Sequence, residues 1–525
     1  MKHFDITFRP DNMQISIHAG ATLLEAAGQA GIILNTVCGG KGICEKCEAI
    51  LEADGRKVLA CQYRIESDLT VTIPACSRFF VQKILAEGID TESQIKCDRY
   101  EKYLPIQPDA QILGAAIDIG TTTVVAKLIN MQNGQCLATE AALNPQSRYG
   151  DDVVSRIAYA DTDSKLAELQ KAIVDCVNEL ISRVCKQAAI DNNQIFEVCA
   201  VGNTTMNHIF LKLPVRQLGQ APYKAYSLDA RDTPASESAL QINPAGNIHT
   251  VENIAGFVGS DTTSVALATS IDSAEEVTLV VDIGTNGELV LGTANKLYAA
   301  SCAAGPALEG ARISCGGRAV EGAIEAVVVN EDDIDLDVIG GCPPRSICGS
   351  GLIDAVAVLL NLGIVDATGR FVKPATMKNK LSPAIFSRII EKDSQLAFVL
   401  DDAQKVILTQ KDVRQVQLAK AAIRAGIILI ERKLGTGDSD IQRIFLAGAF
   451  GNYIRRENAL RIGLLPDVPA ERIHSVGNAA CSGAQMILVS RRCREKAKEL
   501  ARKIEYVEIA HEPDFQNVFA NCMQF

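Results

Sequence analysis

Cysteines near the N-terminus are the residues whose spacing points most directly to chemistry. The pattern C-x5-C-x2-C-x13-C is formed by Cys38, Cys44, Cys47 and Cys61. Thiolates are the ligands that iron-sulfur clusters require, and three from one short loop plus a fourth from a later segment can surround one cluster. Gly39, Gly40 and Gly42 interrupt the loop and allow its backbone to turn closely around such a cluster. The spacing predicts a 2Fe-2S cluster held by these four side chains.

A zinc site is the alternative for the same cysteines. Zinc usually takes two paired motifs of the C-x2-C type, whereas only Cys44 and Cys47 form such a pair. The spacing therefore favours the iron-sulfur cluster over zinc. Cys76 falls outside the pattern and is not expected to be a ligand.

Strand and helix patterns on both sides of the cysteine loop indicate how it is positioned. Residues 3–20, HFDITFRPDNMQISIHAG, predict two alternating strands around a turn, and the helix that follows begins with a capping box between Thr22 and Glu25. Further strands are expected in CEAILEAD, RKVLACQ and DLTVTIP. This order resembles the plant-type ferredoxins, with the cysteine spacing of the adrenodoxin-like variant, and implies a β-grasp ferredoxin domain over residues 1–80.

The whole chain sets further limits. At 525 residues it is too long for one core, and 17 scattered cysteines, an odd number, do not form a disulfide framework. The N-terminus lacks a secretory apolar region and no run of about 18 apolar residues occurs, so we expect a cytoplasmic protein outside the membrane. A net charge of -11 without a basic run argues against nucleic-acid binding.

Residues 81–112 separate the N-terminal domain from the rest. The segment is charged, weakly periodic and contains two prolines near its end. It is interpreted as a linker, with a helical collar packed on the next domain as the alternative.

A strand, a tight polar turn and a returning strand then occur twice. The pattern reads AAIDIGTTTVVAKLINMQNG at 115–134 and LVVDIGTNGELVLGTANK at 279–296, with Asp118 and Asp282 at equivalent places. The small polar turn residues are Gly120, Thr121, Thr122 and Thr123 in the first copy and Gly284, Thr285 and Asn286 in the second. Such turns expose backbone N–H groups to an anion, and an aspartate at the strand end can hold hydrated Mg²⁺. Two copies facing each other would bind a triphosphate from both sides.

A third element, IFLAGAFGNYI at 444–454, is a buried strand that runs into Gly448, Ala449 and Gly451. Small residues there let a flat ring lie against the backbone, which is what an adenosine site needs. A strand-to-helix turn in a core would look the same in isolation. Its position after the two hairpins favours the adenosine site.

The order of two phosphate hairpins and an adenosine loop resembles the superfamily of acetate and sugar kinases, heat-shock chaperones and actin. Together with the ferredoxin domain it resembles the ATP-dependent reductive activators of corrinoid proteins, which return Co(II) corrinoid to Co(I) for methyl transfer. The resemblance implies a multidomain α/β and α+β chain with a two-lobed actin-like ATPase, lobe I at 113–278 and lobe II at 279–525. It implies ATP, Mg²⁺, a corrinoid protein partner and an upstream low-potential electron donor, and it allows a homodimer.

Other stretches that resemble this family contain further polar residues that could take part in the site. Catalytic roles are predicted for Glu288 and Glu309 beside Asp118 and Asp282, because a carboxylate can orient the attacking water. Asp151 could do the same, but a helix cap is the preferred interpretation. Asn203, Thr204 and Thr205 could form a polar turn at the cleft, whereas His208 is expected to be a core histidine. Cys199, Cys315 and Cys348 are expected to be inert.

The combination of a ferredoxin domain with an ATPase domain suggests why the electron transfer would need ATP. Plant-type clusters have potentials near about -400 mV, and each 59 mV deficit costs a one-electron transfer about 1.4 kcal/mol. Because Co(II) reduction is expected to be harder than that, ATP would supply the difference. Two alternatives stay open at this point: an ATP-dependent activator of a radical dehydratase, and a nucleotide-gated redox sensor or chaperone. Simple kinase activity would leave the electron carrier without a role.

Overall fold

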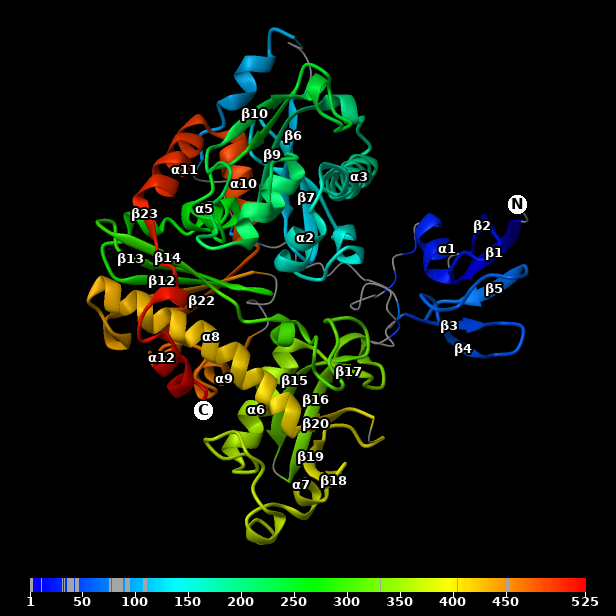
Figure 1. Ribbon diagram of the computed structural model, residues 1–525, viewed down its shortest axis with the longest axis vertical. Helices are drawn as coiled ribbons and strands as arrows, with labels where there is room; N and C mark the ends of the chain where they lie inside the picture. Colours follow the sequence, from blue (N-terminus) through cyan, green and yellow to red (C-terminus); the bar gives the residue numbers. More distant parts are fainter. Residues whose placement is uncertain are drawn as a thin grey trace.

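The structure is a computed structural model. It describes residues 3–10, 12–30, 32, 34, 42, 47–74, 77, 88–89, 95–106, 111–330, 332–403, 405–448 and 454–525. Figure 1 shows a small N-terminal sheet beside a larger body that contains two major sheets. Within the described residues, no helix is long and apolar enough to cross a membrane.

The N-terminal domain is a mixed sheet with the strand order β2-β1-β5-β3-β4. Its elements are β1 (His3–Arg9), β2 (Met13–His18), α1 (Leu23–Gln29), β3 (Glu48–Leu51), β4 (Lys57–Leu59) and β5 (Leu69–Thr72). β1 pairs with β2 antiparallel and with β5 parallel, and the inward side chains form one buried cluster with α1. The predicted capping box is present: the Thr22 N–H donates to Glu25 Oε2 at 2.7 Å and the Glu25 N–H donates to Thr22 Oγ1 at 3.2 Å.

The first major sheet has the order β10-β11-β9-β6-β7-β8. Its strands are β6 (Leu113–Ile119), β7 (Thr123–Asn130), β8 (Cys136–Leu143), β9 (Ile195–Gly202), β10 (Arg231–Pro234) and β11 (Asn247–Thr250). The associated helices are α2 (Val153–Tyr159), α3 (Asp163–Ala188), α4 (Thr204–Phe210) and α5 (Ser260–Ala268). Long apolar runs in β6 and β9 fit strands that are covered on both faces.

The second major sheet has the order β22-β21-β12-β13-β14-β23. Its strands are β12 (Thr278–Ile283), β13 (Gly287–Gly292), β14 (Leu297–Cys302), β21 (Arg443–Ala447), β22 (Ile473–Gly477) and β23 (Ile504–Tyr506). In both sheets an antiparallel three-strand meander has a parallel strand beside its first member, β9 beside β6 and β21 beside β12. The repeated sequence pattern is therefore a repeated sheet topology.

Two smaller sheets extend the second half of the chain. They consist of β15 (Ala323–Asn330), β16 (Asp333–Val338), β17 (Ser346–Ile347), β18 (Ile389–Lys392), β19 (Gln395–Val399) and β20 (Ile407–Thr409). The helices in this half are α6 (Gly349–Asn361), α7 (Pro383–Ser387), α8 (Gln410–Leu434), α9 (Arg456–Arg461), α10 (Ala479–Val489), α11 (Arg491–Lys503) and α12 (Phe515–Cys522). α8 packs on β13 and β14 (Figure 1).

Helices α5 and α10 lie where the two major sheets meet. They pack on each other, and α10 also packs on β6 and β9 (Figure 1). One buried cluster contains side chains from both helices, from β6 and β7 of the first sheet and from β12 and β13 of the second. A C-terminal helix thus forms part of the core on which the first sheet rests.

Part of the predicted linker packs on the larger body. Residues 95–106, called the collar below, contain the 3-10 helix η3 (Arg99–Tyr103). Arg99 Nη2 and Tyr103 Oη donate to the buried carboxylate of Glu197 in β9 at 2.6 and 3.0 Å. Lys102 and, from α11, Arg494 also form ion pairs with Glu197. In this part of the segment the structure follows the packed-collar alternative, which the charged composition alone did not favour.

Candidate functional site

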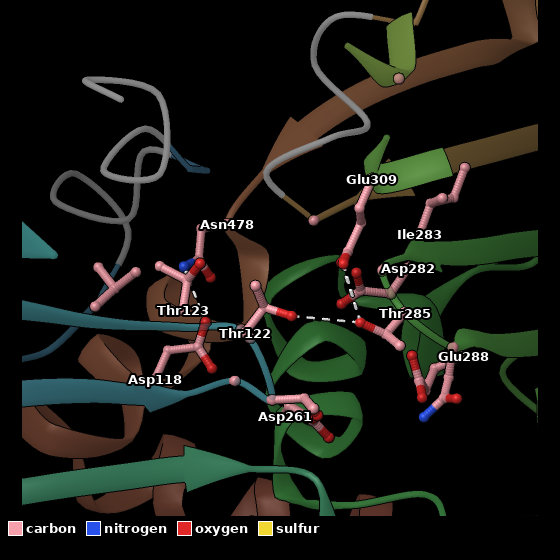
Figure 2. Close-up of a pocket in the computed structure, with 18 of the residues that line it drawn as sticks. Asp118, Thr122, Thr123, Asp261, Asp282, Ile283, Thr285, Glu288, Glu309 and Asn478 are labelled. Carbon is pink, nitrogen blue, oxygen red and sulfur yellow. Dashed lines mark hydrogen bonds between the residues drawn. The ribbon is translucent and has the colours of Figure 1, made fainter. Parts of the chain in front are cut away.

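The turns of the two predicted hairpins line one cavity of about 260 Å³. Asp118 and Asp282 are the last residues but one of β6 and β12, so each carboxylate precedes its turn. Figure 2 shows both pointing into the cavity. Residues 120–123 and 284–286 line the cavity, as do Glu288 and Glu309. The structure therefore brings together residues that are separated by more than 150 positions in the chain.

The first turn is closed by its own backbone and held from one side by an amide side chain. The Gly120 N–H donates to Thr123 O at 2.9 Å, and a Cβ on Gly120 would lie 2.7 Å from that carbonyl oxygen. Only glycine fits such a close approach. Asn203, at the N-cap of α4, donates from Nδ2 to Thr121 Oγ1 at 2.9 Å. Asn203 thus joins the site, whereas Thr204 and Thr205 are buried behind it.

The second turn has the same backbone closure and touches the first. The Gly284 N–H donates to Asn286 O at 2.9 Å. The Thr285 hydroxyl donates to Glu309 Oε2 at 3.1 Å and lies 3.4 Å from the Thr122 hydroxyl (Figure 2). A short chain of side chains, Thr122, Thr285 and Glu309, therefore connects the two hairpins across the cavity.

The carboxylates at the strand ends have raised pKa values because they are buried close to one another. Burial first, and then the negative charge of Asp261, raise the pKa of Asp118 to about 7, although Asn478 Nδ2 donates to Asp118 Oδ2 at 2.9 Å and opposes the shift. Burial and the charges of Asp261 and Asp118 raise the pKa of Asp282 to about 7. Burial also raises the pKa of Asp261, in the first turn of α5, to about 6.

The two glutamates lie on the second hairpin's side of the cavity (Figure 2). Burial, followed by the charges of Asp261 and Asp282, raises the pKa of Glu288 well above its ordinary range. Burial also raises the pKa of Glu309, with the charge of Arg318 opposing it. Placing five carboxylates around one cavity is unfavourable in the absence of cations. The site therefore has the chemistry to attract a divalent cation.

Among the described residues, no three His, Cys, Asp or Glu side chains converge on one position for a metal ion. Mg²⁺ does not need such a cage, because it usually keeps several waters and binds one or two carboxylates together with phosphate oxygens. Asp118 and Asp282 are oxygen donors of that kind at the edge of a cavity. The donor set fits Mg²⁺ that arrives with a phosphate ligand.

The predicted adenosine loop is described only at its start. Gly448 follows β21 and lines the cavity, whereas Ala449 and Gly451 lie outside the described residues. Gly448 has a φ of +86°, and a Cβ there would lie 2.5 Å from Asp282 Oδ1. A side chain at this position would therefore collide with the carboxylate.

Sequence reasoning missed four contributors to the cavity. They are Asp261 and Asn478, at the starts of α5 and α10, and Cys348 and Ser350, at the start of α6. The motifs FVGSDTT and ICGSGLIDA contain three of them and were the available signal. Cys348, which was expected to be inert, is buried at the lining of the cavity, and burial raises the pKa of its thiol.

Other candidates lie away from the cavity. Asp151 is exposed, and the helix cap expected there is one residue later, where Asp152 accepts from the Ser155 N–H at 2.7 Å. His208 is a buried core histidine, as predicted, with Nδ1 2.7 Å from Thr204 O. Burial raises the pKa of Cys199 to about 12, which fits an inert thiol.

The N-terminal cysteines are described in part. Cys47 and Cys61 are buried and close in the fold, because the Ala60 N–H donates to Cys47 O at 2.8 Å. Gly42 has a φ of +76°, so the loop between the cysteines uses the conformational freedom of glycine. Cys38 and Cys44 lie outside the described residues. Two cysteines outside any disulfide, on neighbouring segments of the N-terminal domain, fit the donor chemistry of an iron-sulfur cluster.

Comparisons with known proteins agree with this architecture. Residues 6–66 match a family model described as a 2Fe-2S iron-sulfur cluster binding domain. Residues 113–274 match the RACo middle region, and residues 276–525 match the C-terminal domain of RACo, the ASKHA domain. The N-terminal cofactor is thus supported as 2Fe-2S and the larger body as an ATP-binding domain.

Several relatives match most of the chain. The corrinoid activation enzyme RamQ of Eubacterium limosum is 34% identical over 580 aligned positions, with 96% of each chain covered. A [Co(II) methylated amine-specific corrinoid protein] reductase of Methanosarcina barkeri is 26% identical, over 77% of this chain and 76% of that protein. A solved reductive activator for corrinoid, iron-sulfur protein has a TM-score of 0.72 and 32% identity, and covers 99% of this chain and 98% of its own.

Proposed function

The chain belongs to the family of reductive activators of corrinoid proteins, and on this premise we propose that it couples ATP hydrolysis to the one-electron reduction of a Co(II) corrinoid protein to Co(I). The observation that carries the ATP half is the pair of glycine turns that face one cavity, each preceded by a strand-end aspartate. The N-terminal match to a 2Fe-2S domain carries the electron half.

Phosphate binding would use the two turns together. The N–H groups of Gly120 and Gly284 close the two turns, so the backbone N–H groups of residues 121–122 and 285–286 would donate to phosphate oxygens. The hydroxyls of Thr122 and Thr285 lie between the turns. A triphosphate would replace the contact between those hydroxyls and so engage both hairpins at once. This arrangement makes the distance between the two sheets depend on the bound nucleotide.

The carboxylates of the cavity would bind Mg²⁺ and activate the attacking water. Asp118 and Asp282 would hold Mg²⁺ through its waters, which offsets the repulsion that raises their pKa values. Glu309, fixed by the Thr285 hydroxyl, would orient a water for attack on the γ-phosphorus and accept its proton. A new P–O bond would form as the bond between the γ-phosphorus and the bridging oxygen breaks, leaving ADP and phosphate.

The four cysteine thiolates would hold the cluster, with Cys47 and Cys61 already buried on the N-terminal sheet. When bound, a 2Fe-2S cluster supplies one electron at a time. An upstream low-potential donor would reload it after each transfer. The family membership favours this role over the radical-dehydratase activator and the redox sensor.

We infer that helix α10 could transmit a change from the nucleotide site to the linker. Asn478 begins α10 and donates to Asp118, while Gly88 of the linker contacts Ser482 in the first turn of the same helix. A shift of α10 upon nucleotide binding would therefore reach the chain segment that carries the N-terminal domain. Energetic coupling also requires that the two nucleotide states differ in affinity for one redox state of the partner.

Absorbance spectroscopy tests the proposal. Reduced protein, a Co(II) corrinoid protein and Mg-ATP are mixed, and loss of the Co(II) spectrum is followed. We expect bleaching of the Co(II) spectrum that depends on ATP. It should be lost in Cys47→Ala, which removes a cluster ligand, and in Asp282→Ala, which removes a carboxylate from the cavity. Bleaching of the same rate and extent without ATP would refute the proposal.

A further inference from the structure

Arg156 is a buried cation directly behind the first phosphate turn. It lies in the last turn of α2 and its side chain is fully buried. Burial lowers the pKa of its guanidinium only to about 10, so it remains charged at neutral pH. The stretch NPQSRYGDDVVSRI, to which it belongs, has no role in the function described so far.

The guanidinium makes several hydrogen bonds, all of them to neutral groups. Nη2 donates to Thr121 O at 2.6 Å, Nε donates to Gly150 O at 3.0 Å, and Nη1 lies 3.4 Å from Gln146 Oε1 and 3.1 Å from Met206 Sδ. Removing a charge from water is costly, and neutral partners repay that cost less well than a carboxylate does. The charges of Asp151 and Asp152 favour the charged guanidinium, but the groups that hydrogen-bond to it are the neutral ones. The guanidinium therefore connects these two carboxylates with the backbone of the first turn.

Backbone geometry shows what the Arg156 contact does to the turn. In a trans peptide the C=O of one residue and the N–H of the next point in opposite directions. Because Thr121 O accepts from Arg156, the N–H of Thr122 is directed away from Arg156. In the same way, Asn144 Nδ2 donates to Gly120 O at 2.8 Å, which directs the N–H of Thr121 away from Asn144. Two successive peptide groups are thus held from behind, and both threonines line the cavity.

The cavity in front of the first turn carries an excess of negatively ionisable groups. Its lining contains the carboxylates of Asp118, Asp261, Asp282, Glu288 and Glu309 and the guanidinium of Arg318. The carboxylates therefore outnumber the cation among the described lining residues. A nucleotide's phosphates would bring further negative charge into the same space. A buried guanidinium acts through a medium of lower dielectric than water, so its charge is felt more strongly by a ligand on the other side of the turn.

We propose that Arg156 is a positioning residue for nucleotide phosphates, which orients the first turn and supplies positive charge that favours a triphosphate over less charged ligands. This inference rests on the proposed function, because it assumes that the cavity binds ATP. On this inference, Arg156 is the residue that makes the site bind ATP more tightly than ADP, and ADP more tightly than adenosine.

Calorimetric titration of the full chain with Mg-ATP, Mg-ADP and adenosine tests it. In Arg156→Gln we expect affinity for Mg-ATP to fall by about tenfold or more, the loss typical of a charge-assisted hydrogen bond, with a smaller loss for Mg-ADP and less than about a twofold loss for adenosine. Arg148→Gln is the matched control, because it removes the same charge from an exposed arginine of the same stretch outside the cavity lining. It should change none of the three affinities.

A purely structural role would weaken adenosine and ATP binding by the same factor, and that result would overturn the inference, as would an unchanged ATP affinity in Arg156→Gln. If Arg156→Gln does not fold, Arg156→Lys tests the inference instead, because lysine keeps the positive charge. Arg156→Lys should bind ATP in preference to adenosine, as the wild-type chain does. Loss of that preference would refute the effect of the charge. Failure of the wild-type chain to bind ATP would instead refute the proposed function.

Discussion

Gly448 is the position where a single methyl group should disable the nucleotide site. The residue has a φ of +86°, and a Cβ there would lie 2.5 Å from Asp282 Oδ1 and 3.0 Å from Ile283 O. In Gly448→Ala the carboxylate must therefore move by about 0.5 Å or more to reach a separation that real Cβ atoms show, about 3.0 Å. The left-handed backbone adds a strain of about 1–2 kcal/mol.

The expected consequence is a large loss of ATP turnover with a modest loss of stability. A misplacement of about 1 Å can cost about 100-fold in rate, so ATP hydrolysis should fall by about 10-fold to 100-fold. The free energy of unfolding should fall by about 1–2 kcal/mol, from the strain alone. The assay is phosphate release under saturating Mg-ATP, together with urea unfolding and the visible spectrum of the N-terminal cluster, which should not change.

Gly435→Ala is the matched control. Gly435 ends α8 with a φ of +80°, and a Cβ there would have no neighbour within 4 Å. This variant carries the same backbone strain without a collision, so it should lose stability but retain hydrolysis. Equal hydrolysis by Gly448→Ala and Gly435→Ala would refute the assignment of Asp282 to the nucleotide site.

Two further predictions concern the collar and the N-terminal domain. Glu197→Gln removes the counter-charge of Arg99 and leaves Arg494 with its more distant partner Asp232, so it should lower the free energy of unfolding by about 3 kcal/mol. Burial alone would raise the pKa of Glu197, but the nearby cations lower it from an ordinary value of 4.5 to about 2. The ionised carboxylate therefore stabilises the folded protein fully above about pH 5, and this stabilisation is lost as the pH falls towards 2. Urea unfolding of Glu197→Gln should not show this acid-dependent loss of stability. Cys61→Ser should abolish the visible absorbance of the cluster but leave ATP binding, measured by calorimetry, unchanged. The control Cys342→Ser should preserve both. Loss of ATP binding in Cys61→Ser would contradict the view that the N-terminal domain and the ATP-binding body bind their cofactors separately.

Local patterns predicted those parts of the site that are formed by neighbouring residues. The apolar strands, the glycine turns and the capping box at Thr22 all depend on contacts within a few positions, and the structure contains them. The equivalence of Asp118 and Asp282 could be predicted because the hairpin repeats. Their meeting across one cavity follows from the repeated topology.

Contacts between distant residues could not be predicted in this way. Asn478 reaches Asp118 across 360 positions, and no local pattern links them. The collar looked like a free linker because its charges appeared solvated, but Arg99 and Lys102 are paired with Glu197, which lies inside an otherwise apolar strand. Arg156 likewise contacts Thr121 across 35 positions, and no local pattern indicates that contact.

The most direct test of the central claim measures ATP consumed and Co(I) formed in the same mixture. The full chain and a Co(II) corrinoid protein are poised with a reductant that is too weak to reduce the corrinoid at equilibrium. We predict that Co(I) accumulates only while ATP is hydrolysed, and that it fails to accumulate in Asp282→Ala, which retains the cysteine ligands. The same Co(I) yield without ATP would contradict the claim that ATP drives an uphill electron transfer.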